Sequence, residues 1–297
     1  MKWAIDVSSY DSVLDKDTIQ AIDWTRARDE GGLSLAIIKC SEGIRQDPAF
    51  SVQWKAVSGI LPRAAYHFFR SNVDAIKQAQ ACWTILSAAG FTKDDYIILD
   101  YETLDGLIPS RSLLLAASWL YEMEKHGTVP MIYTYPGFWQ SIKGPEATWA
   151  AKYPLALAQW PKDNWILKYS PTIFTADKLV SLKKDIESGL LKPMMLKPWS
   201  SPAIWQFTSR VDSHAIPGHP AVKKVVDYDA VLMTLPQPIA AGPVAGPTSA
   251  TPSSPILDPT KPPVLTENPL GVVTGSDPGG QEGVTRCPTC GQVIPKG

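Results

Sequence analysis

Residues 96–102 read YIILDYE, and this segment combines the strongest strand signal in the chain with two acidic residues. An uninterrupted apolar run leads directly into two acidic residues, Asp100 and Glu102. Continuous apolar runs are typical of parallel strands that are covered on both faces. Further short segments, several of them equally apolar, predict strands at residues 3–7, 34–39, 64–68, 131–133, 155–158, 203–207 and 223–228.

Helical patterns separate many of these segments. Residues 47–58, 74–89 and 110–126 are each followed by a glycine, as expected where a helix ends. A strand followed by a helix, repeated along the chain, indicates parallel βα units. About eight such strands in roughly 235 residues predict an irregular TIM-like β/α barrel. An open doubly wound sheet is the alternative, but no G-x-G-x-x-G follows the first strand.

Composition excludes several classes of protein. The chain has 297 residues, of which 44% are hydrophobic and 19% charged, and its formal net charge is -1. A chain of this length can bury a full core. Its near-neutral charge lacks the excess of Lys and Arg that is typical of proteins that bind nucleic acid. No apolar run approaches the roughly 20 residues that span a bilayer, so we expect no membrane insertion. The N-terminus shows neither the apolar region nor the cleavage site of a secretory signal.

The character of the sequence changes after Leu235. Residues 1–235 form the predicted catalytic barrel. Residues 236–283 are dense in Pro, Gly, Ser and Thr, which predicts a disordered, flexible linker. Residues 284–297 are a short tail. The chain therefore divides into a barrel, a linker and a terminal element.

The cysteines follow two patterns. Cys40 and Cys82 lie in apolar stretches and are predicted to be buried thiols. Cys287 and Cys290 form a C-x-x-C pair in the tail, which offers two of the four ligands that zinc requires. The alternatives are a zinc half-site completed by another chain, a redox pair or an incidental remnant. Its terminal position favours attachment or self-association over catalysis.

Acidic residues recur at the carboxyl ends of predicted strands, at Asp6, Asp100 with Glu102, and Asp227. In a barrel these ends open onto one face, where active sites lie. Asp100 and Glu102 are two apart, so on an extended strand they project to the same side, about 6–7 Å from each other. Repulsion and partial burial should raise the pKa of one, leaving an acid beside a carboxylate. This combination cleaves glycosidic bonds. A D-x-E pair that caps a helix or binds solvent is the alternative.

Aromatic residues provide an independent line of argument, since the chain has 11 Trp and 10 Tyr. Those at or near predicted strand ends are Tyr66, Tyr133, Trp160 and Trp205. Flat rings that line a cleft suit the apolar faces of sugar rings. Core packing is the alternative, and we expect it for Trp24, Trp54 and Trp83 on helical patterns.

Seven short motifs occur in a fixed order: AIDVS (4–8), IKCSEG (38–43), AYHF (65–68), LDYE (99–102), IYT (132–134), IWQF (204–207) and VDYD (226–229). Each is unspecific alone, but together they make the chain similar to glycoside hydrolase family 25, the Chalaropsis-type lysozymes or N-acetylmuramidases. The resemblance covers about residues 1–233.

The resemblance implies a flattened, irregular β/α barrel that cleaves the β-1,4 bond between N-acetylmuramic acid and N-acetylglucosamine in peptidoglycan, without a metal or organic cofactor. It makes Glu102 the proton donor and Asp100 either a nucleophile or a group that orients the substrate's acetamido oxygen. Asp6 and Asp227 are further acidic residues of the site. The residues expected to contact the substrate are Tyr66, Tyr133, Trp160, Trp205, Gln206 and Lys39.

The chain departs from the family pattern in three places. The loop at residues 11–20 is longer, and Asp229 adds a carboxylate where the family has Asn. A long connection between Trp160 and Trp205 contains a helical stretch near residues 175–189, which we expect on one wall of the cleft.

The implied substrate is the bacterial cell wall, and the chain shows no secretory signal. We therefore expect a phage-type endolysin, made in the host cytoplasm and acting on the cell wall after release, or a lysin carried on a virion through its tail. Two other functions stay open. One is a non-catalytic peptidoglycan-binding or structural virion protein. The other is a hydrolase of another N-acetylated polysaccharide such as chitin.

Overall fold

The computed structural model describes residues 1–11, 14–15, 18–160, 173–220 and 225–235, with two short strands near the C-terminus. The chain divides into two compact units, Met1–Ala240 and Ala241–Gly297. In the second unit, β12 (Thr285–Arg286) pairs antiparallel with β13 (Val293–Ile294). The predicted linker, residues 236–283, lies outside the described residues, as do Cys287 and Cys290. The predictions for these segments stay predictions.

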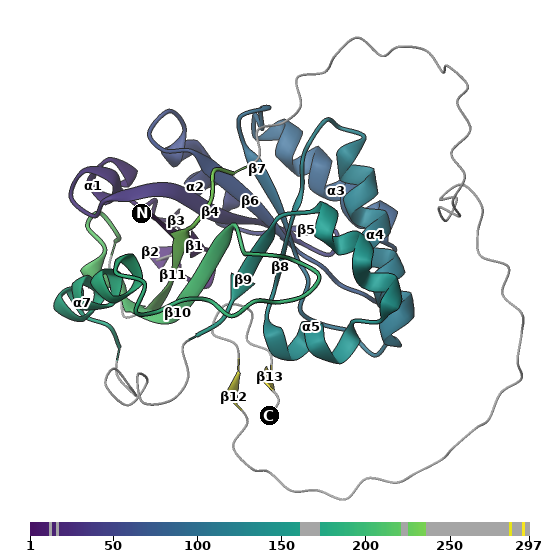
Figure 1. The fold of residues 1–297 in the computed structure, drawn as a ribbon. Coiled ribbons are helices and arrows are strands. Elements are labelled where there is room, and N and C mark those ends of the chain that lie inside the picture. The colour runs from purple at the N-terminus through teal and green to yellow at the C-terminus, as the bar shows by residue number, and fades with distance from the viewer. Residues whose placement is uncertain are drawn as a thin grey trace, which may run out of the picture. The chain divides into compact units, whose positions relative to one another are not determined.

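Eight strands of the first unit close into a barrel, which confirms the predicted fold (Figure 1). Around the barrel they are β1 (Lys2–Val7), β4 (Leu33–Glu42), β6 (Arg63–Phe68), β7 (Tyr96–Asp100), β8 (Met131–Thr134), β9 (Leu155–Ala158), β10 (Ile204–Asp212) and β11 (Val225–Val231). Neighbouring strands from β1 through β10 in this order are parallel. The carboxyl ends of these strands therefore meet at one end of the barrel, here called the mouth.

The last strand corrects one expectation. β11 runs antiparallel to both β10 and β1, and Asp227 is its third residue rather than its end. The chain between β10 and β11 has only the short η2 (Ser213–Ala215) among its described residues, whereas a parallel return needs a long crossover. Because β11 is reversed, its beginning lies level with the end of β1, with Asp227 opposite Asp6. Asp227 thus reaches the mouth from the opposite strand direction.

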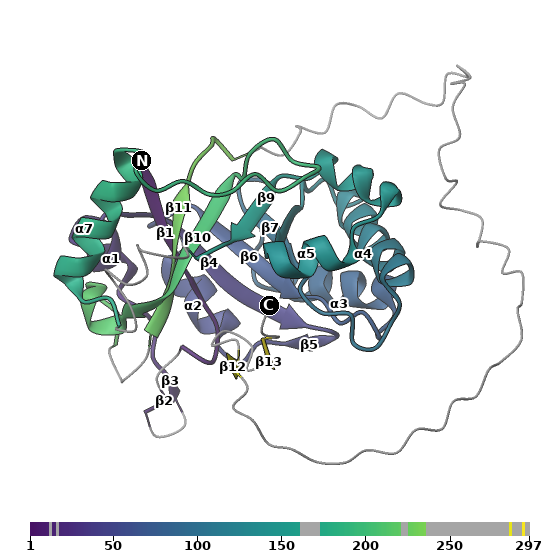
Figure 2. The ribbon, with the colours of Figure 1, turned by 60° about the horizontal axis from the view of Figure 1, so that its bottom comes forward.

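The predicted helices are present as α2 (Phe50–Val57), α3 (Ala75–Ala88) and α4 (Pro109–Glu124). Gly59, Gly90 and Gly127 follow them with φ of 73°, 74° and 77°, the left-handed conformation that ends a helix. With α5 (Pro136–Ile142), α3 and α4 lie outside the β6–β8 part of the barrel in both ribbon views (Figures 1 and 2). The remaining short elements are α1 (Trp24–Asp29), β2 (Leu14–Asp15), β3 (Thr18–Ile19), β5 (Arg45–Gln46) and η1 (Pro145–Lys152). No described helix is both long and apolar enough to cross a membrane.

The helix predicted after residue 175 forms as α7 (Ala176–Glu187). Lys183 donates a 3.2 Å hydrogen bond to the Tyr228 hydroxyl and lies 4.9 Å from the centre of the Trp3 ring. Both aromatic rings belong to the core outside the barrel, so α7 packs behind β1 and β11. The segment after α7 returns toward β9, where the Met194 amide donates to Gln159 Oε1 at 2.7 Å.

Strand alternation divides the interior into two apolar clusters. Outward side chains pack against the helices in the larger cluster, which contains Trp24, Trp54 and the two buried thiols Cys40 and Cys82. Trp83 packs against its edge, so the predictions for these residues are confirmed. Inward side chains fill the barrel in a smaller cluster of residues that includes Ala4, Leu35, Ile37, Tyr66, Ile98, Met131, Ala156, Ile204 and Val231. Toward the mouth this apolar filling gives way to polar residues.

Candidate active site

A layer of buried polar side chains lies at the mouth, directly above the apolar filling. This polar layer consists of Asp6, Lys39, Asp100, Gln206, Asp227 and Asp229, which are between 2% and 7% exposed. Asp6 lies opposite Asp227 on paired strands, and Gln206 lies opposite Asp229. Burial of so many ionisable groups is costly, and such concentrations mark functional sites.

Gln206 connects the polar layer with the aromatic side chains. Its Nε2 donates to Asp6 Oδ2 at 2.8 Å, and its Oε1 accepts from the Tyr133 hydroxyl at 3.2 Å. The same Oε1 accepts from Trp160 Nε1 at 3.4 Å. Since an indole nitrogen can only donate, this contact sets the orientation of the Gln206 amide. Tyr133 is partly exposed and Trp160 is 37% exposed, so both rings border the open side of the site.

Asp100 and Glu102 lie at different depths. Asp100 is the last residue of β7, opposite Phe68 of β6 and Tyr133 of β8, and is 4% exposed. Glu102 follows just beyond the strand and is partly exposed. A group that transfers a proton to a substrate must reach it, whereas a group that stabilises charge acts best when buried. The two depths fit these two roles.

The backbone on both sides of Glu102 is anchored. The Tyr101 hydroxyl lies 2.6 Å from Ser112 Oγ, and the ring packs in the core. On the other side, the Ser71 hydroxyl donates to the Thr103 carbonyl at 2.8 Å. Ser71 and Ser112 are themselves 2.6 Å apart, so one hydroxyl cluster fixes both neighbours of Glu102.

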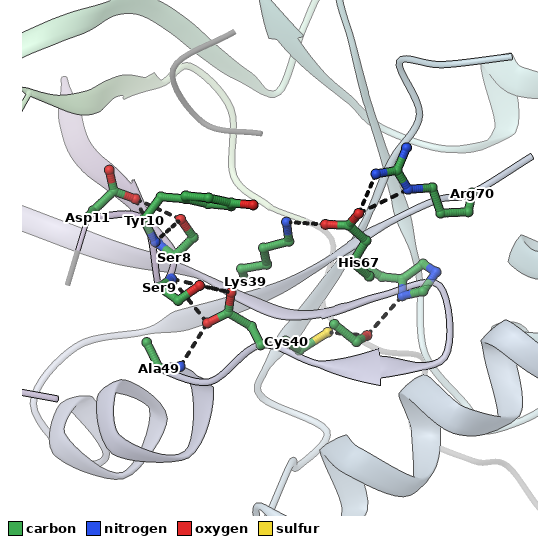
Figure 3. A network of polar contacts seen from close by, with 12 residues as sticks. Ser8, Ser9, Tyr10, Asp11, Lys39, Cys40, Ala49, His67 and Arg70 are labelled. Carbon is green, nitrogen blue, oxygen red and sulfur yellow. Dashed lines mark hydrogen bonds and ion pairs between the residues drawn. The ribbon is translucent and has the colours of Figure 1, made fainter. Parts of the chain in front are cut away.

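A chain of ion pairs supports Lys39 beneath the mouth (Figure 3). The Lys39 ammonium donates to Glu42 at 2.9 Å, and Glu42 accepts from Arg70 Nε at 2.9 Å. Arg70 also reaches Asp105 at 3.1 Å, in the loop after Glu102. Burial favours a lower pKa for Lys39, but the hydrogen bond and charge of Glu42 outweigh it, so the pKa is raised. Lys39 is therefore a charged side chain within the barrel, and it is 2% exposed.

His67, labelled in Figure 3, connects strand β4 with helix α3. Its Nδ1 lies 2.8 Å from Ser41 Oγ, and its Nε2 lies 3.3 Å from Gln78 Oε1. Gln78 Oε1 accepts from the Arg70 amide at 3.0 Å, and Gln78 Nε2 donates to the Arg70 carbonyl at 2.8 Å. Because Gln78 presents its acceptor, a proton lies on Nε2 of His67. Burial lowers the pKa of His67 to about 3.

We expect His67 to make the fold acid-sensitive. In the unfolded chain its pKa is near 6.5, so between pH 6.5 and 3 the unfolded state binds a proton that the folded state excludes. The contribution of the neutral ring to stability is intact above pH 6.5 and is lost as the pH falls, by about 2–3 kcal/mol between pH 7 and 4.5. Urea unfolding at both pH values should show this difference shrinking in His67→Gln. The control, His214→Gln at the surface, should keep it, and an unchanged pH dependence in His67→Gln would contradict the assignment.

Four predicted substrate contacts are largely buried, and two of them, Lys39 and Gln206, are 2% exposed within the polar layer. Trp205 is 1% exposed and packs in the outer core, where its Nε1 donates to the Gln159 carbonyl at 2.7 Å. Alternation along β10 turns Trp205 outward when Gln206 faces inward, so the structure does not place this ring at the mouth. Tyr66 faces inward but is 5% exposed and belongs to the apolar filling, so its ring offers little surface to a sugar.

The structure places at the site several residues to which the sequence analysis gave no role there. Asp229 joins the polar layer, and Arg70, Ser71 and Asp105 hold the loop around Glu102. Alternation from Asp227 could have found Asp229, since residues two apart on a strand face the same side. The described residues contain no group of three or more His, Cys, Asp or Glu that could hold a metal ion.

Taken together, a buried carboxyl beside a more exposed one is what acid-assisted cleavage of a glycosidic bond requires. The model of glycosyl hydrolases family 25 matches residues 5–216 of the chain. The chain belongs to this family. The family 25 match includes Asp6, Asp100 and Glu102 but ends before β11, so Asp227 joins the site through the barrel closure that the structure shows.

One curated relative and two solved structures show what the chain is similar to. An N,O-diacetylmuramidase of Arthroderma benhamiae is 30% identical over 147 residues, which are 46% of this chain and 62% of that protein. The chain thus spans less than two thirds of this curated relative. Among solved structures, a lysozyme of Streptomyces coelicolor has a TM-score of 0.57 at 20% identity, covering 79% of this chain and 93% of that one. The catalytic domain of an endolysin from a Listeria monocytogenes bacteriophage has a TM-score of 0.53 at 15% identity, covering 78% and 93%. These two likenesses concern the fold.

Proposed function

We propose that this family 25 chain is a peptidoglycan hydrolase, a muramidase that cleaves the β-1,4 bond between N-acetylmuramic acid and N-acetylglucosamine. The observation that carries the proposal is the partly exposed Glu102 placed next to the buried polar layer at the mouth of the barrel. Glu102 gives a proton to the glycosidic oxygen as the bond breaks. Asp100 stabilises the positive charge that develops at the anomeric carbon, either directly or by orienting the acetamido oxygen of the substrate.

The test is an analysis of products from purified peptidoglycan. Digests are reduced with borohydride and examined by mass spectrometry, with chitin digested in parallel. We expect new reducing ends at N-acetylmuramic acid and no release of sugars from chitin. New ends at N-acetylglucosamine, equal cleavage of chitin, or binding to the wall without any product would each contradict the proposal.

Trp160 and Tyr133 supply the sugar-binding wall in this proposal. Both rings are partly exposed, and Gln206 ties both to the polar layer. We expect Trp160→Ala to raise KM for soluble peptidoglycan fragments about tenfold, since a stacked aromatic contact contributes about 1–1.5 kcal/mol. The rate at saturation should change less. Tyr121→Ala on α4, also an exposed aromatic, is the matched control. An unchanged KM in Trp160→Ala would remove this ring from the binding surface.

We further propose that the chain acts as a phage-type endolysin, made in the cytoplasm of a bacterial host and reaching the wall after release. The fold is compatible with this source, because the catalytic domain of a phage endolysin shares it. Expression inside bacteria should leave the cells intact until their membrane is permeabilised, after which they should lyse. Lysis without permeabilisation, or the presence of the chain on purified virions, would contradict this route.

For the tail, we propose that Cys287 and Cys290 form a zinc half-site that a second chain completes, which joins two copies. The C-x-x-C spacing and the four ligands that zinc requires support this proposal. Zinc content per chain and molar mass in solution are measured for the full chain and for Cys287→Ser. We expect about one zinc per two chains and a dimer that the substitution abolishes. Zinc no higher than in Cys287→Ser would end the proposal.

A further inference from the structure

Asp229 is a buried carboxyl at the site to which the reaction assigns no step. It faces the barrel interior on β11, opposite Ala4 of β1 and Gln206 of β10, and is 2% exposed. Asp6 lies opposite Asp227, two residues away. Asp6 and Asp229 are therefore diagonal neighbours on one face of two paired strands, with their Cα atoms about 7–8 Å apart and their side chains within reach.

The two carboxyls differ in their hydrogen bonds. Asp6 Oδ2 accepts a 2.8 Å hydrogen bond from Gln206 Nε2. Asp229 Oδ2 is buried and has no hydrogen-bond partner among the residues that the structure describes. A donor stabilises the charged form of a carboxyl, and burial without one favours the neutral form. The negative charge of this pair therefore belongs on Asp6 and the proton on Asp229.

Among the residues that the structure describes, the surroundings of the pair offer no charge that would reverse this order. The described titratable groups that face the same interior are Asp6 from β1, Lys39 from β4, Tyr66 from β6, Tyr96 and Asp100 from β7, Tyr133 from β8 and Asp227 from β11. The cation among them, Lys39, is already engaged by Glu42. Burial, and then the charge of Asp6, raise the pKa of Asp229 well above its usual value.

We propose that Asp229 is a positioning residue that stays protonated at neutral pH, so that Asp6 keeps both its charge and its hydrogen bond to Gln206. Gln206 in turn orients Tyr133 and Trp160. When Asp229 loses its proton to solvent at alkaline pH, two adjacent carboxylates repel each other and Asp6 is displaced from Gln206. The effect on hydrolysis rests on the proposed function, whereas the protonation of Asp229 does not.

Infrared spectroscopy tests the proton directly. A protonated carboxylic acid has a carbonyl stretching band separate from those of carboxylates and amides. We expect this band in the difference between the full chain and Asp229→Asn at pH 7. The control Asp23→Asn, at the exposed N-terminus of α1, should give no such band. Absence of the band from the Asp229 difference at pH 7 would overturn the proposal.

Unfolding equilibria provide a second readout that does not depend on hydrolysis. The pKa of Asp229 is higher in the folded chain than in the unfolded chain, so its contribution is complete below about pH 4 and is lost as the pH rises. The unfolding constant of the natural chain, relative to that of Asp229→Asn, should rise by up to about tenfold per pH unit above pH 4. A ratio that does not change with pH would overturn the proposal.

The pH profile of hydrolysis connects the proton to the site. We expect the rate of Asp229→Asn to fall less steeply at alkaline pH than that of the natural chain, because an amide cannot ionise. Identical alkaline limbs, with the infrared band present, would show a buried acid without a positioning role and would overturn the proposal. If neither protein hydrolyses peptidoglycan, the proposed function fails, while the infrared and unfolding experiments still decide whether Asp229 holds a proton.

Discussion

Replacing Glu102 by Gln lowers hydrolysis of peptidoglycan by at least about 10³-fold and leaves the chain folded. The amide has nearly the shape of the carboxyl but cannot transfer a proton to the glycosidic oxygen. Both neighbours of Glu102 are held by the hydroxyl cluster of Ser71, Ser112 and Tyr101, so the substitution should not move the backbone. Initial rates on purified peptidoglycan measure the loss, and far-UV circular dichroism with the melting temperature verifies the fold.

An activated substrate separates proton donation from a general structural defect. An aryl glycoside with an acidic phenol as leaving group needs little help from an acid. Glu102→Gln should therefore lose far less activity on such a substrate than on peptidoglycan. The control is Glu30→Gln, whose side chain is 51% exposed in a surface ion pair, and it should act like the natural chain on both substrates. Equal losses of Glu102→Gln on both would remove Glu102 as the proton donor.

The parts of this site that could be predicted from sequence follow from periodicity. An apolar strand that ends in an acidic residue places that residue at the mouth of a barrel, and this holds for Asp6 and Asp100. Alternation also separates inward from outward side chains. Applied strictly on β10, it would have excluded Trp205 as soon as Gln206 was placed inward.

Other features depend on contacts that no local pattern records. The hydrogen bond between Gln206 and Asp6 joins residues 200 positions apart, and Arg70 reaches Asp105 across 35. The direction of β11 depends on how the chain returns from β10, and polar loop residues have no period that would reveal it. Asp227 was placed at the mouth by an argument about parallel strands, and it is there because its strand is antiparallel.

The second large effect that we expect is on stability, at the opposite end of the barrel. Arg63, the first residue of β6, forms a two-point ion pair with Asp95, at 2.7 Å and 3.1 Å, and both side chains are nearly buried. Its guanidinium also donates to the Trp54 carbonyl at 2.9 Å and stacks 4.0 Å from the centre of the Trp54 ring. Asp95→Asn leaves the Arg63 charge buried without its counterion, which should cost about 3–5 kcal/mol. Urea unfolding measures this loss of free energy, and in thermal unfolding it corresponds to a melting temperature lower by roughly 10 °C.

Two comparisons show whether burial is the cause of this loss. The surface pair of Arg28 and Asp29 has the same 2.7 Å contact, but its side chains are 42% and 57% exposed, so Asp29→Asn should destabilise the chain far less than Asp95→Asn. Removing both buried charges, as Arg63→Met with Asp95→Asn, should recover part of the stability that Asp95→Asn loses, because no unpaired charge remains. Similar losses for Asp29→Asn and Asp95→Asn would contradict the argument. Since Arg63 begins a strand whose other end lies at the mouth, the rate of hydrolysis per folded molecule should stay the same, which separates what holds the barrel together from what acts at its mouth.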